Sequence, residues 1–208
     1  MRRIILSILL IIMTYCSDSK NVDMLKKHIE NSDWKQAKNL VAKLGDVNVK
    51  NSKGPTLLHF LLNQKIPDSS LAIALIDKGS DISAVDNNGN TALHLTHSKK
   101  IASYLIKKGA NAKAKNHGGA IPLVSSLALG ETEFGLVLLY IKHGIDLNFQ
   151  DDSGKTALHY AMERELYEVG VLLIKNGADI YIKDKQGLSP KDLNKLQKIR
   201  KKKSTNKS

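Results

Sequence analysis

The tripeptide Gly154–Thr156 is the segment whose chemistry is easiest to recognise, because a nucleotide-binding phosphate loop ends in Gly-Lys-Thr. That loop also needs an earlier glycine, and this chain has Phe149 at the required position. Two sister copies of the segment have Asn90 and Pro55 where the lysine would stand. We therefore predict no nucleotide cofactor.

The remaining reactive side chains do not form a recognisable catalytic or metal set. His94 and His97 stand three residues apart, but no third ligand is close in sequence, and zinc sites use three or four protein ligands. Cys16 is the sole cysteine, so no histidine has a nearby thiol and no disulfide can form within one chain. The carboxylates Glu163 and Glu165 are more typical of a solvated helix end than of an acid and base pair. We predict a protein that is not an enzyme and holds no metal or cofactor.

The Gly-Lys-Thr tripeptide belongs to a segment that is repeated along the chain. "GKTALHY" at Gly154 recurs as "GNTALHL" at Gly89 and "GPTLLHF" at Gly54, with a spacing of about 33 residues. Each unit closes on a second shared segment, such as "KGANA" at Lys108 and "NGADI" at Asn176. The D-x-x-G-x-T-x-L-H opening and the G-A-D closing resemble the ankyrin repeat.

Each unit must supply two helices that position the repeated segment. Thr56, Thr91 and Thr156 precede short apolar helices, where a threonine side chain can satisfy an unpaired backbone amide. Glycines follow the second helices, where a left-handed residue ends a helix at low cost. The resemblance implies an all-α solenoid of helix-turn-helix units with short β-turn hairpins. It also implies a structural role, hydrogen bonding to the backbone of the turn and of the neighbouring repeat, for three histidines: His59, His94 and His159.

The resemblance covers residues 21–203 and divides the chain into parts. We assign a signal peptide to residues 1–16, a short linker to 17–20, the ankyrin-repeat domain to 21–203 and a basic disordered tail to 204–208. Within the domain we expect an N-terminal cap (21–50), four repeats (51–85, 86–115, 116–150 and 151–183) and a C-terminal cap (184–203). Terminal units of such arrays are atypical because one side faces water.

Two repeats depart from the pattern. In the third, Ile121 and Val124 replace the threonine and the histidine of the motif. The second lacks several residues between its helices. Either these units are a soft point of the stack or their packing has adapted.

The N-terminus has the organisation of a bacterial secretory signal. Arg2 and Arg3 precede an apolar run, residues 4–13, that is too short to span a bilayer. Cys16 follows directly, where a lipoprotein signal places the residue that is acylated, although Tyr15 stands where such signals have a small residue. Acylation of Cys16, ordinary cleavage near it and an uncleaved anchor all stay open. We expect an exported protein, periplasmic or anchored in a bacterial envelope as a lipoprotein.

The net charge of +12 is concentrated near the C-terminus, in "KIRKKKSTNKS". A solvated tail explains this composition, and so does a contact with an anionic surface. The second explanation gives the alternative function, an envelope-associated structural protein that binds through its tail. We expect no nucleic-acid binding, because aromatic or groove-binding features are missing from the tail.

The function that the resemblance implies is a protein-binding module, of the scaffold or inhibitor type, that holds another protein on a concave surface of turn tips and first helices. The chain would act as a monomer. Because the predicted surface lacks aromatic anchors, we expect modest affinity unless Phe60 or Tyr160 contributes. The positions that match this surface are Ser52, Lys53, Asn63, Gln64, Asn87, Asn88, Asn90, Ser98, Lys99, His117, Asp152, Ser153, Lys155, Glu163 and Arg164.

Overall fold

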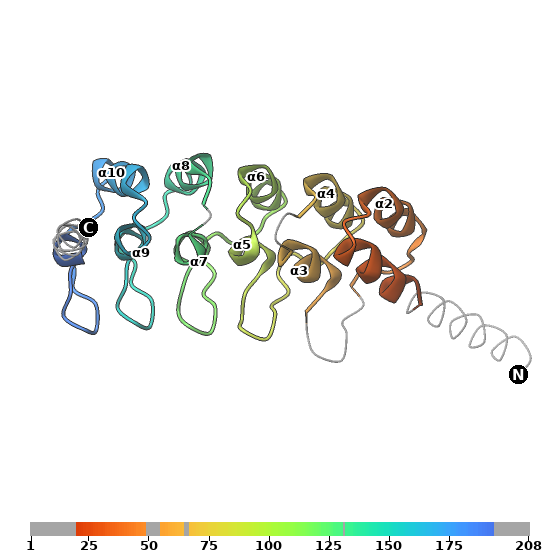
Figure 1. Ribbon diagram of the computed structural model, residues 1–208, viewed down its shortest axis with the longest axis horizontal. Helices are drawn as coiled ribbons and strands as arrows, with labels where there is room; N and C mark the ends of the chain where they lie inside the picture. Colours follow the sequence, from red (N-terminus) through yellow and green to blue (C-terminus); the bar gives the residue numbers. More distant parts are fainter. Residues whose placement is uncertain (1–19, 49–54, 65–66, 131, 194–208) are drawn as a thin grey trace, which may run out of the picture. The chain divides into compact units, whose positions relative to one another are not determined.

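The computed structural model describes residues 20–48, 55–64, 67–130 and 132–193. These residues form helices and turns, with no strand among them (Figure 1), which confirms the predicted all-α class. They fall into two compact units that divide between Asn87 and Asn88, close to the predicted boundary between the first and second repeats. Among the described residues, no helix is both long enough and apolar enough to cross a lipid bilayer.

The first unit contains two helix pairs. A helix over residues 20–30 precedes α2 (Trp34–Lys43), and α3 (Leu57–Leu62) precedes α4 (Ser69–Asp77). α4 packs against both α2 and α3. The buried core of this unit consists mainly of leucine and isoleucine side chains, to which α2 adds Ala37 and Val41.

The second unit contains three helix pairs and the start of a further helix. The first helices of the pairs are α5 (Ala92–Leu95), α7 (Pro122–Leu129) and α9 (Ala157–Glu163), and we call them the inner row. The second helices are α6 (Lys99–Lys107), α8 (Phe134–Lys142) and α10 (Tyr167–Lys175), which we call the outer row. Neighbouring inner helices contact one another, as do α6 and α8 (Figure 1), and residues 190–193 are helical.

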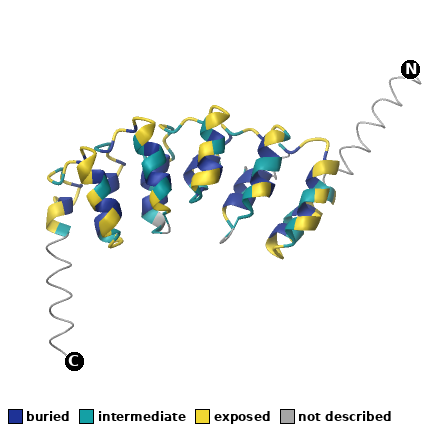
Figure 2. Cartoon of the chain, turned by 90° about the horizontal axis from the view of Figure 1, so that it is seen from above, coloured by how far each residue is buried: buried dark blue, intermediate teal, exposed yellow. Residues whose placement is uncertain are grey.

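The core lies between the two rows, and each helix turns its buried side chains toward its neighbours (Figure 2). Tyr140 of α8 is fully buried, and its hydroxyl donates a hydrogen bond to the Leu93 carbonyl of α5 at 3.3 Å. Burial raises the pKa of Tyr140 well above its ordinary range, so the phenol stays protonated. This side chain therefore fastens an outer helix to an inner helix of the preceding pair.

Long hairpin turns connect each outer helix to the next inner helix, and glycine is required at two kinds of position in them. Gly109 directly follows the capping residue of α6 with φ of 97°, as the sequence pattern predicted. Gly154 lies in the hairpin before α9 with φ of 77°, and a Cβ there would stand 2.9 Å from the Lys185 amide nitrogen. Side chains are excluded at Gly154 because the next hairpin packs directly against it.

Candidate functional site

The threonine and histidine of the repeated segment form one hydrogen-bonded unit at the start of each regular inner helix. In α9, the Thr156 amide donates to His159 Nδ1 at 3.0 Å, and the Thr156 hydroxyl lies 2.8 Å from the same nitrogen. Because Nδ1 accepts the amide proton, the neutral imidazole carries its own proton on Nε2. That proton is donated to the Leu188 carbonyl at 3.1 Å, in the following hairpin.

The same arrangement recurs in the other regular repeats. His94 Nδ1 accepts the Thr91 amide at 3.1 Å, and its Nε2 bonds the Ala120 carbonyl of the next hairpin at 3.1 Å. In the first unit the Thr56 amide lies 3.3 Å from His59 Nδ1. Burial lowers the pKa of His159, which keeps the ring neutral. His94 and His159 thus bond both their own turn and the next hairpin, and His59 bonds its own turn at Thr56.

The tips of successive hairpins in the second unit are joined by single backbone hydrogen bonds. The His117 amide donates to the Asn88 carbonyl at 2.9 Å, and the Asp152 amide donates to the Gly118 carbonyl at 3.0 Å. In the same way, the Lys185 amide of the next hairpin donates to the Ser153 carbonyl at 3.0 Å. These bonds hold the tips side by side, and the side chains of Asn88, His117, Asp152 and Ser153 stay exposed.

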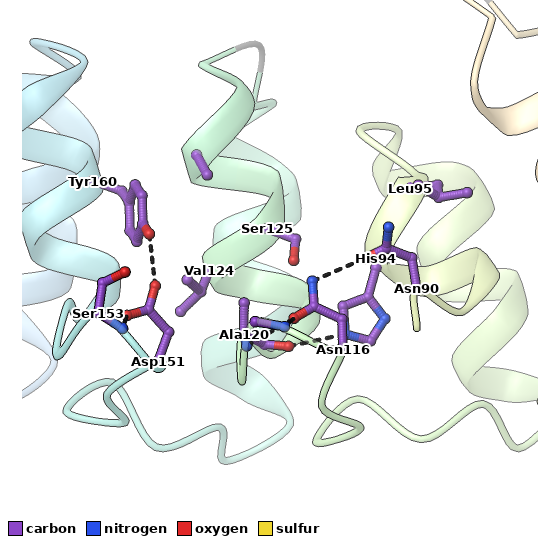
Figure 3. A pocket seen from close by; sticks show the side chains of 12 residues that line it. Asn90, His94, Leu95, Asn116, Ala120, Val124, Ser125, Asp151, Ser153 and Tyr160 are labelled. Atoms are coloured by element: carbon purple, nitrogen blue, oxygen red, sulfur yellow. Dashed lines mark hydrogen bonds between the residues drawn. The ribbon is translucent and has the colours of Figure 1, made fainter. Parts of the chain in front are cut away.

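A groove of about 350 Å³ lies along these hairpins and the inner row (Figure 3). It crosses three successive repeats, so no single repeat could form it. The residues that line it come from the hairpins and from the exposed side of α5, α7 and α9: Asn90, His94, Leu95, Asn116, Gly118, Ala120, Val124, Ser125, Ala128, Asp151, Ser153 and Tyr160.

Polar side chains along the hairpin edge of the groove hold one another and the turns. Asn116 donates to the Asn90 side-chain oxygen at 2.9 Å, and its own oxygen accepts the amides of Gly118 and Ala120 at 3.0 Å each. Asp151 has the same function in the next hairpin, where it accepts the Ser153 amide at 2.8 Å. The hairpin edge is therefore a rigid polar rim.

The middle of the groove is apolar because the third repeat lacks the polar motif residues. Val124 stands where the other repeats have histidine, and Ala120 and Ala128 contribute only methyl groups. The aromatic side chain at the far end is Tyr160, whose hydroxyl donates to Asp151 Oδ2 at 2.6 Å (Figure 3). Burial, with help from the Asp151 carboxylate, raises the pKa of Tyr160.

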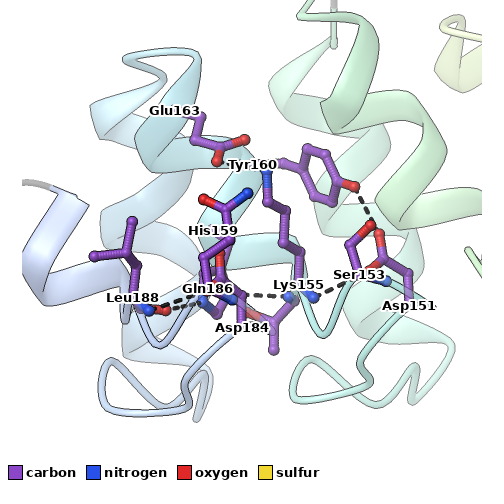
Figure 4. A network of polar contacts seen from close by, with 10 residues as sticks. Asp151, Ser153, Lys155, His159, Tyr160, Glu163, Asp184, Gln186 and Leu188 are labelled. Atoms are coloured by element: carbon purple, nitrogen blue, oxygen red, sulfur yellow. Dashed lines mark hydrogen bonds and ion pairs between the residues drawn. The ribbon is translucent and has the colours of Figure 1, made fainter.

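Two predicted contact residues pair with each other beside Tyr160. Lys155 Nζ lies 2.7 Å from Glu163 Oε1, and the same ammonium group stands 5.4 Å from the centre of the Tyr160 ring (Figure 4). The two charges therefore compensate one another across the start and end of α9. A partner would meet this pair as a nearly neutral surface.

The structure brings only a fraction of the predicted contact set to the groove. Asn90 and Ser153 line it, and the exposed tip residues Asn88, His117 and Asp152 stand along its hairpin edge. Arg164 caps the end of α9, with its side chain 3.5 Å from the place that a Cβ on Gly130 would take. Asn63, Gln64 and Asn87 belong to the first unit, and Ser52, Lys53 and Cys16 lie outside the described residues.

The placement of Ser98 and Lys99 on the first helix of their repeat was wrong. The inner helix α5 has only four residues and ends before an extended Thr96, so the chain reaches the outer row early. Ser98 is the N-cap of α6, and Lys99 is its first residue, with an amide that donates to Glu133 Oε2 at 3.0 Å. The two predicted positions would lie on a first helix of full length, such as α9, but α5 is shorter and ends before them.

Sequence reasoning named Tyr160 only as a possible aromatic contributor and missed Leu95 and Ser125, although a signal for all three exists. Leu95, Ser125 and Tyr160 each directly follow the motif histidine or its replacement, and all three line the groove. One residue further along a helix is a rotation of about 100°, which turns this position out of the inter-repeat contact. Within the described residues, no group of three or more histidine, cysteine, aspartate or glutamate side chains could hold a metal ion.

Comparison with known proteins agrees with this architecture. The model of the family "Ankyrin repeats (3 copies)" matches residues 12–116 and 97–184. The chain is 34% identical over 130 residues to the neurogenic locus notch homolog protein 1 of Danio rerio, and 28% identical over 191 residues to the nuclear factor NF-kappa-B p105 subunit of Gallus gallus. These alignments cover 61% and 86% of this chain, but only 5% and 19% of the relatives.

Ankyrin repeats typically serve as non-catalytic protein-interaction modules, and the matched regions of these relatives are not enzymes. The family model extends over most of the described residues, including every Thr–His unit and the whole groove. The chain belongs to the ankyrin-repeat family and is a protein-interaction module of the repeat type.

Proposed function

We propose that the groove along α5, α7 and α9 is the surface that holds the partner, and that the bound element is an extended segment of another protein. The observation that carries this proposal is the groove's course across three repeats, with a polar rim on one side and an apolar middle. An extended chain presents alternating polar backbone and side-chain groups over such a length. A compact small ligand would need a more enclosed cavity.

The chemistry of the groove supports a contact of modest affinity. The rim groups Asn116 and Asp151 already bond their own hairpins, so they can add little to partner binding. The half-buried side chains of Leu95, Ala120 and Ala128 and the ring of Tyr160 supply the surface that a partner can remove from water. One aromatic anchor is fewer than tight interfaces usually have.

A peptide library displayed on phage and selected against the intact chain tests this proposal. Ser125→Arg places a long charged side chain in the middle of the groove, and we expect it to reduce capture of the selected peptides at least about tenfold. Ser103→Arg is the matched control, because Ser103 is exposed on α6, in the outer row. Equal capture by both variants, with equal melting temperatures, would place the binding surface elsewhere.

We also propose that this module works outside the cytoplasm, as a scaffold or an inhibitor in a bacterial envelope. The support is the sequence of residues 1–16, with its two arginines, its apolar run and Cys16. Intact mass spectrometry of the protein from its native cells distinguishes the three fates of this segment. An N-terminal Cys16 carrying acyl chains would establish a lipoprotein, whereas an intact Met1 in a soluble fraction would exclude export.

A further inference from the structure

Exposed apolar side chains are unevenly distributed over the described residues. Seven large ones are exposed, and four of these, Phe134, Tyr167, Val171 and Ile174, lie on the neighbouring outer helices α8 and α10. Their exposed fractions lie between 41% and 51%. Contiguous apolar surface of this kind on a soluble domain marks a place where another surface packs.

The position of α10 in the outer row explains why its side chains are exposed. Phe134 of α8 lines a hollow of about 320 Å³ together with four residues of α10, so it faces the next outer helix; the four are Glu168, Val171, Leu172 and Lys175. Tyr167 holds the equivalent first position of α10. Beyond α10, however, the described residues add only the helical turn 190–193, which continues the inner row (Figure 1). Tyr167 and Ile174 therefore hold the positions on α10 that would pack against a further outer helix, but no outer helix follows α10 within the described residues.

The exposed face of α10 is complementary to itself. Tyr167, Val171 and Ile174 are spaced by four and then three residues, which is the spacing of a helix-pairing seam. Glu168 and Lys175 flank this seam, equally far from its middle and close to the same side of the helix. When two such helices run antiparallel about a two-fold axis, Glu168 of one faces Lys175 of the other, and the reverse pair forms as well.

We propose that two copies of this chain associate through α10, packed antiparallel about a two-fold axis close to Val171. The opposite charges at the two ends of the seam select a second copy in this orientation, because the antiparallel arrangement places Glu168 of one copy beside Lys175 of the other. The segment 194–208, which lies outside the described residues, holds two large apolar side chains, Leu196 and Ile199, among mostly basic and polar ones. From the sequence we expected a monomer, and no motif in the sequence indicated this pairing.

The proposed pairing uses different residues from the groove, so the dimer would keep the groove of each copy available. A single helix seam is smaller than a standard interface of about 1,200 to 2,000 Å². We therefore expect a weak dimer whose population rises with concentration.

Sedimentation velocity of the full chain over a wide concentration range tests the pairing. Val171→Lys places two ammonium groups together at the axis and should weaken dimerisation at least about tenfold. Val85→Lys is the matched control, because Val85 in the first unit is 48% exposed and should leave the dimer unchanged. A chain that stays monomeric at all concentrations, or a dimer that survives Val171→Lys, would overturn the proposal.

Charge reversal tests the antiparallel orientation separately. Glu168→Lys and Lys175→Glu should each weaken the dimer, and the two substitutions together should restore it, because the swapped charges again face opposite partners. Failure of the double variant to recover would refute this orientation. Circular dichroism melting of each variant controls for folding.

A cross-link reports the axis directly, even for variants with altered affinity. In a Cys16→Ser background, Val171→Cys should form a disulfide-linked dimer under mild oxidation, while Val85→Cys should not. Equal cross-linking of the two would show that contact at Val171 is random and would contradict the proposal.

Discussion

Replacing His159 by alanine removes a side chain that joins two repeats, and its cost can be worked out from three contacts. The Thr156 amide loses its acceptor, and Thr156 is fully buried. A buried donor left without a partner costs about 1 to 3 kcal/mol. The Leu188 carbonyl also loses a donor, but it keeps the Asp184 amide at 2.9 Å and is not stranded. We expect the free energy of unfolding to fall by about 2 to 3 kcal/mol.

Urea unfolding followed by circular dichroism measures this loss. With a dependence of about 1 to 3 kcal/mol per molar urea, the midpoint should fall by roughly 1 M. His143→Ala is the control, because His143 is exposed at the end of α8, and an exposed substitution should stay within about 0.5 kcal/mol. A His159→Ala variant that is no less stable than the control would refute the reasoning. Capture of a groove ligand should be unchanged when the two proteins are compared at equal folded fraction.

Two further predictions follow from the same repeats. Burial lowers the pKa of His159 in the folded chain below the ordinary value of 6.5, so the unfolded chain binds more protons. The free energy of unfolding should therefore be highest above about pH 6.5 and should decline as the pH falls through the folded-state pKa. Urea midpoints measured from neutral to mildly acidic pH should show this decline, and His159→Ala should have the shallower slope. Gly154→Ala should lower the free energy of unfolding by about 1 to 3 kcal/mol, because φ is positive there and the new Cβ would press on the Lys185 amide. At Gly177 a Cβ would have no atom within 4 Å, so Gly177→Ala should cost less in the same unfolding assay. Equal losses of unfolding free energy for the two glycine variants would mean that the contact between neighbouring hairpins at Gly154 contributes nothing to stability.

The framework could be predicted from the sequence because it depends on local chemistry that each repeat restates. The N-caps at Thr56, Thr91 and Thr156 precede their helices as expected. At the C-terminal end, the Ser189 amide donates to Asp192 Oδ2 at 3.1 Å and the Asp192 amide donates to the Ser189 hydroxyl oxygen at 3.3 Å, which together form a capping box. Hydrogen bonding to Ser189 lowers the pKa of Asp192 accordingly.

The candidate site could be predicted only partially, because it depends on relations between repeats. The groove needs three inner helices, and the sequence of one helix does not reveal that Ser125 and Tyr160 lie along the same surface. Lys155 and Glu163 stand eight residues apart and meet because the Lys155 side chain extends along α9, beside the Tyr160 ring, toward the helix end (Figure 4). The exposure of Ile174 depends on the described residues adding no further outer helix, since its counterpart Ile141 has the same local sequence pattern.

Val124 also affects how cooperatively the second unit unfolds. His94 couples the second repeat to the third, and His159 couples the fourth to the C-terminal cap, but a valine cannot donate to the carbonyl of the next hairpin. In a linear array whose stability is a sum of nearest-neighbour terms, the junction between the third and fourth repeats lacks this histidine contribution, which the two flanking junctions have. The groove crosses that junction. A segment bound in the groove would contact both the third and the fourth repeat and so stabilise their junction. Ligand binding would then make the unfolding of the second unit more cooperative.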